Sequence, residues 1–268
     1  MVVGRIARLL PPNVRRRILK LAQRQARRAG YALVVAPARE TGAPTWDVWD
    51  WVAAQAQIRT IIDIGANDGE YGAYLHEFFA ARTVHAFEPL ASSRAKLDAL
   101  RGRIPDLRVH TVALSDEVGQ AIFHENAFGP ASSLLQISDE ARRAFPETES
   151  AVAVTVPLAR LDDILSVDTL EPDIFIKIDV QGAEDRVIRG GQAVFSAASV
   201  VLIEMSFAPF YVGQPLFDDV HRQLTTCGLH FAGFKNQIND PSNGRPLFAH
   251  CLYLRQSDPA PTGPHAQA

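Results

Sequence analysis

Short apolar stretches of strand length end in an acidic side chain at three places, namely 84–88 in Glu88, 173–179 in Asp179 and 200–204 in Glu204. In an open sheet of parallel strands the carboxyl ends share one edge, and ligands bind at that edge. A carboxylate there can accept hydrogen bonds from ligand hydroxyls or take up the proton of a reacting hydroxyl. The sequence therefore predicts a sheet edge that binds a ligand and carries chemistry.

Lys177 and Asp179 alternate along the stretch 173–179, so their side chains share one face of the strand. We expect Asp179 to act as the general base or to orient the acceptor, with Lys177 tuning its charge. The alternative is a buried pair of Lys177 with Asp179 or Glu204 that only organises the sheet edge. Asp179 and Glu204 offer oxygen ligands for a divalent cation, but two carboxylates are too few, and no metal site is predicted.

A glycine turn follows the apolar stretch 61–64, and a helical pattern begins near Glu70. Gly65 and Gly69 are spaced Gly-x-x-x-Gly, which differs from the Gly-x-Gly-x-x-Gly of dinucleotide binding. Gly65 lets a ligand lie against the main chain, and Asp63 precedes it by two residues. An acid beside one glycine turn suits a zwitterion better than a diphosphate. The amino acid end of S-adenosylmethionine is such a ligand.

The following segments extend this binding site. An acid at the tip of the second strand, Glu88, can accept both hydroxyls of a ribose. A third strand is expected at 107–112, and Leu114 and Asp116 follow at its tip. Leu114 is placed to touch an adenine ring, and Asp116 to accept a hydrogen bond from its exocyclic amine. The alternative is a simple turn, because Asp116 begins a sequence with good turn chemistry.

Apolar strand patterns alternate with helical patterns through most of the chain, which is typical of an α/β fold. The connection 116–157 is too long for an ordinary α/β loop and holds strand-like stretches at 121–124 and 151–156. We expect it to form a lid or substrate wall above the binding edge. Among the histidines, only His110 and His124 are expected to reach a site, and a structural role is favoured for both.

The 268 residues are 47% hydrophobic, enough for one sizeable core with extensions. The two cysteines make neither a disulfide framework nor a zinc site, so a cytoplasmic location is expected. Residues 1–30 hold nine basic side chains and no acid, which leaves a net charge of −12 on the rest. This asymmetry leaves two interpretations of the basic arm: a peripheral contact with anionic membrane at the inner membrane face, or a helix packed on the domain or frayed at the terminus, which is favoured. No binding of nucleic acid is expected.

Together these stretches resemble the FkbM family of methyltransferases. The resemblance rests on residues 63–69, 87–89, 113–116, 132–134, 161–162, 176–184 and 201–204. It implies a Rossmann-like α/β sheet of seven strands with an antiparallel last strand, S-adenosylmethionine as cofactor, and O-methylation of a sugar hydroxyl or natural product. It also implies that Asp63, Gly65 and Asn67 face the methionine end, with Glu88 at the ribose and Asp116 near the adenine. Gln181 stands where the family more often has Glu.

Three segments are expected: a basic helical extension at 1–57, a methyltransferase domain at 58–255 and a disordered tail at 256–268. Two other functions stay open. One is a non-catalytic cofactor-binding or membrane-associated module on the same fold. The other is a nicotinamide oxidoreductase, which the glycine spacing disfavours. Methylation of base amines is disfavoured because no Pro-Pro-aromatic run follows Asp179.

Overall fold

The computed structural model describes residues 48–126, 131–144, 148, 150–240 and 243–255. The chain divides between Thr45 and Trp46, and all of these residues belong to the unit that begins at Trp46. The predicted basic arm and disordered tail therefore lie outside the described residues. Among the described helices, none is long and apolar enough to cross a membrane.

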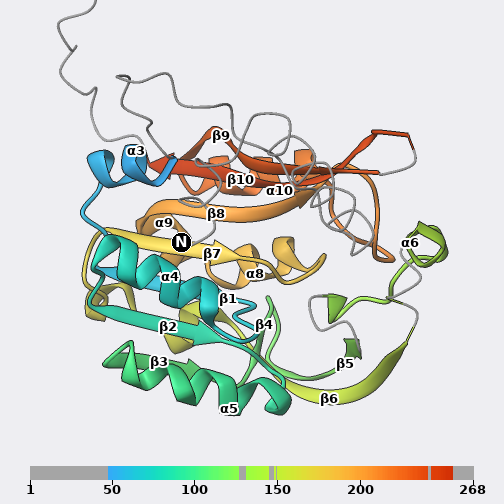
Figure 1. Ribbon diagram of the computed structural model, residues 1–268, viewed down its shortest axis with the longest axis horizontal. Coiled ribbons are helices and arrows are strands. Elements are labelled where there is room, and N and C mark those ends of the chain that lie inside the picture. Colours follow the sequence, from blue (N-terminus) through green and yellow to red (C-terminus); the bar gives the residue numbers. More distant parts are fainter. Residues whose placement is uncertain (1–47, 127–130, 145–147, 149, 241–242, 256–268) are drawn as a thin grey trace, which may run out of the picture. The chain divides into compact units, whose positions relative to one another are not determined.

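Seven strands form one sheet in the order β3-β2-β1-β7-β8-β10-β9 (Figure 1). They are β1 (Thr60–Ile64), β2 (Thr83–Phe87), β3 (Asp106–His110), β7 (Ile174–Ile178), β8 (Ala198–Ser206), β9 (Leu229–Asn239) and β10 (Pro246–Arg255). The five neighbouring strands β3, β2, β1, β7 and β8 are parallel to one another, whereas β10 runs antiparallel to both β8 and β9. The predicted Rossmann-like sheet is confirmed. Its strand order reverses between β1 and β7, and ligands bind at such a point.

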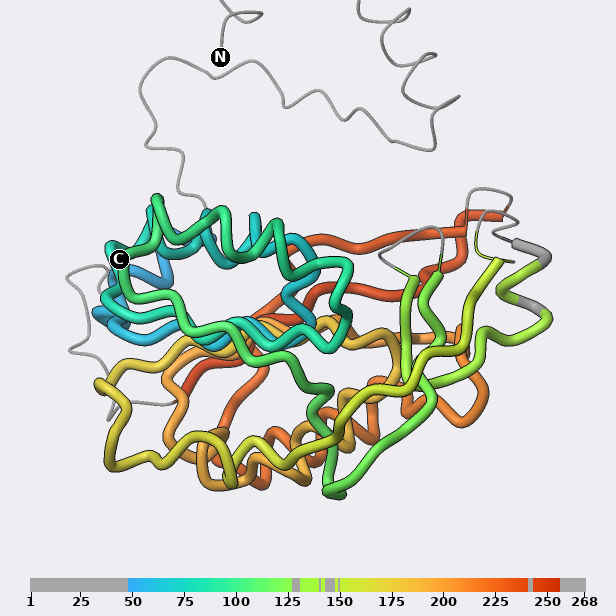
Figure 2. Tube along the Cα trace, turned by 90° about the horizontal axis from the view of Figure 1, so that it is seen from below, coloured from blue at the N-terminus to red at the C-terminus, as the bar shows by residue number. Residues whose placement is uncertain are grey.

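The central strands are apolar throughout because helices cover both faces of the sheet (Figure 2). Ile61 and Phe175 pack in a core with one set of helices, and Ile62 and Ile176 pack in a second core with the other set. The first set is α3 (Val48–Gln55), α4 (Glu70–Phe79) and α5 (Ala91–Ala99), and the second is α7 (Leu161–Ile164), α8 (Glu184–Gly190), α9 (Gln192–Ala197) and α10 (Phe217–Thr226).

Helix α3 belongs with the sheet. Trp49 and Val52 are buried in the first core, and the Trp49 ring meets Phe175 edge-on with centroids 5.7 Å apart. The sequence analysis placed this helix in an extension that ends at residue 57. The packing shows instead that the unit with the sheet begins before α3, because the helix buries its apolar face against the central strands.

The connection 116–157 and the short strand before it form a second, three-stranded sheet in the order β4-β6-β5. Its strands are β4 (Ala113–Leu114), β5 (Gly119–Asn126) and β6 (Ala151–Ala159), with α6 (Asp139–Ala144) between β5 and β6. The two predicted strands lie within β5 and β6. The connection is joined to the segment after β7, because the Ser133 hydroxyl donates to the backbone oxygen of Gln181 at 2.6 Å.

The glycine turn after β1 approaches the chain itself. Gly65 has a φ of +73°, and a Cβ there would lie 2.0 Å from the backbone oxygen of Asp179. Gly69 caps α4 with a φ of +78°, and a Cβ there would meet the side chains of Leu97 and Leu100. Both glycines are therefore required by contacts within the fold. Gly65 also lines the cavity at the sheet edge, whereas Gly69 does not.

Replacement of Gly65 by alanine is expected to lower the free energy of unfolding by at least ~2 kcal/mol, from the left-handed backbone and the clash with Asp179. Urea denaturation of the variant measures this loss. Gly102→Ala is the control, because nothing lies within 4 Å of a Cβ at Gly102 and its φ is ordinary. A loss of similar size in both variants would contradict the role of the close approach.

Candidate active site

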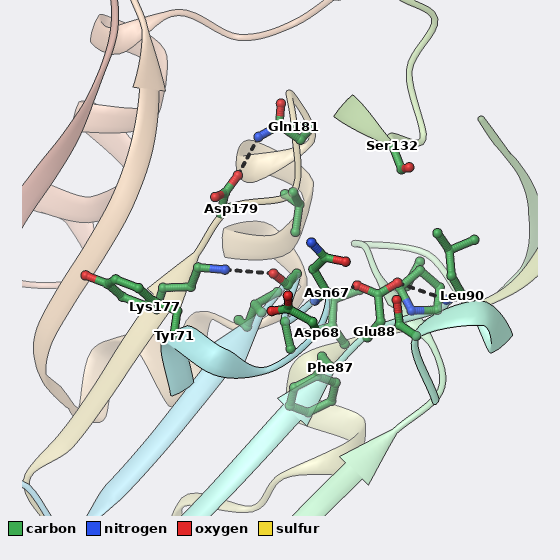
Figure 3. Close-up of a pocket in the computed structure, with 18 of the residues that line it drawn as sticks. Asn67, Asp68, Tyr71, Phe87, Glu88, Leu90, Ser132, Lys177, Asp179 and Gln181 are labelled. Atoms are coloured by element: carbon green, nitrogen blue, oxygen red, sulfur yellow. Dashed lines mark hydrogen bonds between the residues drawn. The ribbon is translucent and has the colours of Figure 1, made fainter. Parts of the chain in front are cut away.

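A cavity of about 620 Å³ opens at the carboxyl ends of the parallel strands (Figure 3). It is lined by the turn after β1, the ends of β2 and β7, the insertion 116–157, and residues of β9 and β10. Six of the side chains or turn residues predicted from the sequence line it, namely Gly65, Asn67, Glu88, Leu114, Lys177 and Asp179. A cavity of this size is in the range of cofactor sites.

Glu88 joins the glycine turn to the segment that follows β2. Its Oε2 accepts a hydrogen bond from the backbone amide of Asn67, and its Oε1 accepts one from the amide of Leu90, both at 2.9 Å. Burial raises the pKa of Glu88, although these two amides favour the charged form. A carboxylate has lone pairs for about four hydrogen bonds, so Glu88 can still accept from a ligand.

Asp63 lies beneath the cavity and does not line it, contrary to expectation. The β1–β7 register places Asp63 beside Lys177. The Lys177 Nζ atom is 3.1 Å from Asp63 Oδ1 and donates to the backbone oxygen of Gly65 at 2.7 Å. Helix α4 leaves room for the carboxylate through Gly72, where a Cβ would lie 2.7 Å from Asp63 Oδ2. Asp63 therefore orders the turn through Lys177.

The acidic partner of Lys177 is thus Asp63, and neither Asp179 nor Glu204 forms the direct ion pair considered as an alternative. Burial opposes the charge of Lys177, but Asp63 and Asp179 outweigh it and raise the pKa of the ammonium. Lys177 remains positive and acts on Asp179 at a distance, which agrees with the predicted tuning of its charge.

Asp116 does not reach the cavity, so the expected contact with an adenine is wrong. Its carboxylate pairs with Arg189 of α8 at 2.7 Å, and its backbone oxygen accepts from Arg160 at 3.0 Å. Burial opposes ionisation of Asp116, but the hydrogen bond from Arg189 holds its pKa below the usual range. Leu114, two residues earlier, does line the cavity.

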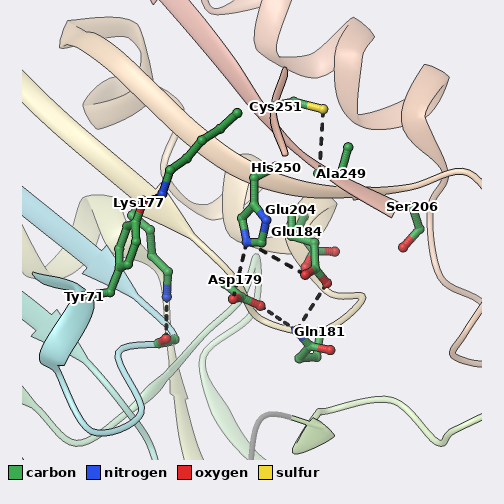
Figure 4. A network of polar contacts seen from close by, with 12 residues as sticks. Tyr71, Lys177, Asp179, Gln181, Glu184, Glu204, Ser206, Ala249, His250 and Cys251 are labelled. Atoms are coloured by element: carbon green, nitrogen blue, oxygen red, sulfur yellow. Dashed lines mark hydrogen bonds and ion pairs between the residues drawn. The ribbon is translucent and has the colours of Figure 1, made fainter. Parts of the chain in front are cut away.

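A polar cluster occupies the end of the cavity next to β8 and β10 (Figure 4). The Gln181 amide donates to Asp179 Oδ1 at 2.5 Å and to Glu204 Oε1 at 3.2 Å. Its own oxygen accepts from the Tyr211 hydroxyl at 2.8 Å. His250 Nε2 lies 3.9 Å from Asp179 Oδ2 and 3.9 Å from Glu204 Oε2. The cluster unites four elements of the chain.

The two carboxylates of the cluster differ in their readiness to ionise. Burial opposes the charge of Asp179, but His250 and Lys177 beside it lower its pKa to about 2. Burial and the negative charges of Asp179 and Glu184 raise the pKa of Glu204 well above its usual range. Asp179 lines the cavity and Glu204 lies next to it, and neighbouring carboxylates with divergent proton affinity are typical of a catalytic site.

The insertion forms one wall of the cavity through five side chains, Phe123, Glu125, Asn126, Ser132 and Leu134. On the opposite side, Lys235 of β9 donates to the Tyr71 hydroxyl at 2.5 Å and lies over the Tyr71 and Trp49 rings. Tyr71 and Lys235 both line the cavity, and the sequence analysis identified neither. They come from α4 and β9, which only the fold brings together.

The two histidines expected to be within reach of a site, His110 and His124, do not line the cavity, and His250 does. His110 stacks against Phe87 and contacts the ring of His85 at 3.1 Å, and it does not line the cavity. His124 lies at a separate small pocket. His250 is the histidine of the active-site cavity, because β10 pairs it directly with Glu204 of β8. The register of this antiparallel pair, which local sequence does not reveal, was the missing information.

Residues 63–232 match the Methyltransferase FkbM domain, so the chain belongs to the FkbM methyltransferase family. The match begins at the end of β1 and contains the turn, Glu88, Asp179 and Glu204, whereas His250 lies beyond it. The family assignment confirms the predicted resemblance and supports S-adenosylmethionine as the cofactor.

Two curated relatives are similar over part of their length. The 2-O-methyltransferase NoeI of Sinorhizobium fredii is 30% identical over 161 residues, which cover 58% of this chain and 66% of NoeI. The 31-O-demethyl-FK506 methyltransferase FkbM of Streptomyces tacrolimicus is 29% identical over 154 residues, which cover 48% of this chain and 58% of that protein. The chain thus spans less than two thirds of the length of these relatives.

Among solved structures, the methyltransferase FkbM of Methylobacillus flagellatus KT is similar with a TM-score of 0.47 and 16% sequence identity. The similarity covers 74% of this chain and 44% of that protein.

Replacement of Asp63 by asparagine is expected to lower the free energy of unfolding by ~3 kcal/mol, because it leaves the buried ammonium of Lys177 without its anion. Chemical denaturation measures the loss. Glu171→Gln is the matched control, since it breaks an ion pair with Arg82 whose side chains are 42% and 61% exposed, and a loss of at most ~0.5 kcal/mol is expected there. Equal losses in the two variants would show that Lys177 does not depend on Asp63.

Proposed function

We propose that the protein transfers a methyl group from S-adenosylmethionine to a hydroxyl of a sugar or another small molecule. The observation that carries the proposal is one cavity that joins the glycine turn and Glu88 to Asp179 and His250, with Glu204 beside His250. The names of the relatives NoeI and FkbM describe methylation at oxygen, which supports the choice of a hydroxyl acceptor.

The residues that line the cavity fit the cofactor. Gly65, Asn67, Glu88 and Leu114 all line the cavity. In this proposal Gly65 and Asn67 would face the methionine end, Glu88 would accept hydrogen bonds from the ribose, and Leu114 would contact the adenine. When bound, S-adenosylmethionine supplies an electrophilic methyl group. Lys177 holds the turn in place through the Gly65 oxygen, so the backbone is ordered before a ligand arrives.

The polar cluster is suited to an acceptor hydroxyl. Asp179, with its lowered pKa, is charged at neutral pH and can accept a hydrogen bond from the hydroxyl. It is a weak base, so it takes up the proton as the new bond to the methyl carbon forms and the oxygen becomes positively charged. Gln181 fixes the orientation of the Asp179 carboxylate. The insertion closes one side of the cavity and restricts water, which favours alignment of donor and acceptor. Asp179 is thus the residue we assign to the acceptor, with Lys177 in support.

Two alternatives make different predictions. A nicotinamide oxidoreductase would bind NADH in this cavity, and the family assignment favours a methyltransferase over it. A non-catalytic module would bind S-adenosylmethionine without transferring its methyl group to any acceptor.

Calorimetric titration tests the cofactor. S-adenosylmethionine is expected to bind the wild-type protein with a micromolar Kd, and Glu88→Ala is expected to weaken binding at least ~10-fold, because hydrogen bonds to a charged group are lost. Glu117→Ala, which removes an exposed carboxylate, should leave the Kd unchanged. Absence of binding by S-adenosylmethionine and its demethylated product would refute the methyltransferase assignment, and binding of NADH would favour the oxidoreductase.

Transfer of labelled methyl groups to a panel of sugars and hydroxylated natural products tests the reaction. On an accepted compound, Asp179→Asn is expected to lower kcat at least ~10²-fold through loss of the proton acceptor, with little change in the Kd of S-adenosylmethionine. Asp139→Asn, which alters a side chain that is 88% exposed, is the control. Unchanged kcat in Asp179→Asn would remove Asp179 from the chemistry.

A further inference from the structure

We propose that Asp179, Glu204 and His250 bind a divalent cation at the acceptor end of the cavity. The sequence offered only two carboxylates there, and the structure adds an imidazole as the third ligand. These three residues each present a ligand atom within 4.8 Å of the others. The inference rests on the proposed function, since the cation would hold the acceptor hydroxyl.

The distances favour a shared ion over direct contacts. The separation of 3.9 Å between His250 Nε2 and each of the carboxylate oxygens, Asp179 Oδ2 and Glu204 Oε2, is too long for a hydrogen bond. Two atoms that each lie ~2.2 Å from one ion are ~3.1 Å apart at right angles and ~3.8 Å apart at 120°. The observed separations therefore suit ligands of a single cation.

One oxygen of each carboxylate already accepts a hydrogen bond from Gln181, and this fixes the direction of the other oxygen. Gln181 donates to Asp179 Oδ1 and to Glu204 Oε1, so Oδ2 and Oε2 face the imidazole of His250. Gln181 is itself held by the Tyr211 hydroxyl and by the Ser133 contact to its backbone oxygen. This arrangement points both free oxygens at one place without help from a ligand.

The scaffold beneath the three ligands is a continuous part of the sheet. Glu204 and His250 are direct partners in the antiparallel β8–β10 pair, and Asp179 follows β7, the other neighbour of β8. Ligands on three adjacent strand segments are fixed by the backbone ladder. A site built on strands keeps its geometry better than one on loops.

The ligand types indicate which cation fits. Two carboxylates and one imidazole suit Mn²⁺, Fe²⁺, Co²⁺ or Zn²⁺, whereas Mg²⁺ and Ca²⁺ prefer oxygen ligands alone. Three protein ligands leave coordination positions for the acceptor, and a hydroxyl bound to a cation loses its proton more easily. With the cation bound, Asp179 is a ligand of the ion, and this replaces its direct contact with the acceptor. The acceptor hydroxyl then binds the ion and releases its proton to solvent water in the cavity.

Calorimetric titration of MnCl₂ into protein freed of metal by EDTA, without S-adenosylmethionine, tests the site. One Mn²⁺ is expected to bind per chain, and Glu204→Gln and His250→Ala are each expected to weaken binding at least ~10-fold. Glu117→Gln and His230→Ala remove exposed side chains of the same types and should bind as the wild type does. Thermal unfolding in EDTA, similar for wild type and Glu204→Gln, shows that this variant is folded.

Absence of Mn²⁺ binding, or binding of equal strength in all four variants, would overturn the inference. The same preparations are titrated with S-adenosylmethionine in EDTA, so the two proposals can fail separately. Binding of S-adenosylmethionine with methyl transfer that EDTA does not reduce would retain the proposed function and refute the cation. Binding of Mn²⁺ that depends on Glu204 and His250, without binding of S-adenosylmethionine, would retain the cation site and refute the proposed function.

Discussion

The sheet edge depends on the buried ion pair of Asp63 and Lys177. The two residues are register partners in β1 and β7, the strands between which the strand order reverses. Burial of two charges is costly, and here the cost is offset by their attraction and by the hydrogen bond from Lys177 to the Gly65 oxygen. The pair therefore connects the central strands to the glycine turn that lines the cavity.

The ammonium of Lys177 lies near several acidic side chains. Asp179, Glu204 and Glu184 lie close enough to perturb one another, and burial raises the pKa of Glu184 to about 7. The single charge of Lys177 cannot balance Asp63 and three further carboxylates. At least one of these three carboxyl groups is therefore expected to stay protonated. Neutral donors complete the arrangement, among them the backbone amide of Gly182, which donates to Glu184 Oε1 at 3.0 Å.

Sequence patterns predicted those features that depend on neighbouring residues. Apolar runs located the buried strands, and alternation along 173–179 correctly placed Lys177 and Asp179 at one cavity. Features that depend on pairing between distant segments were missed. Asp63 precedes the glycine turn as a ligand-binding acid would, yet its partner is set by the β1–β7 register. The position of His250 near the cavity follows from its pairing with Glu204 across β8 and β10. Asp116 does not reach the cavity because its carboxylate forms an ion pair with Arg189 of α8.

The side-chain amide of Gln181 links the polar residues of the cluster to one another. Its backbone has a φ of +57°, a conformation that is strained for a residue with a side chain and is retained at functional sites. A glutamate carboxylate at this position could not donate to Asp179 and Glu204 as the amide does. A Glu would add negative charge next to both. With Gln, the second oxygens of both carboxylates remain available beside His250, and Gln181 thereby determines the charge and geometry at this end of the cavity.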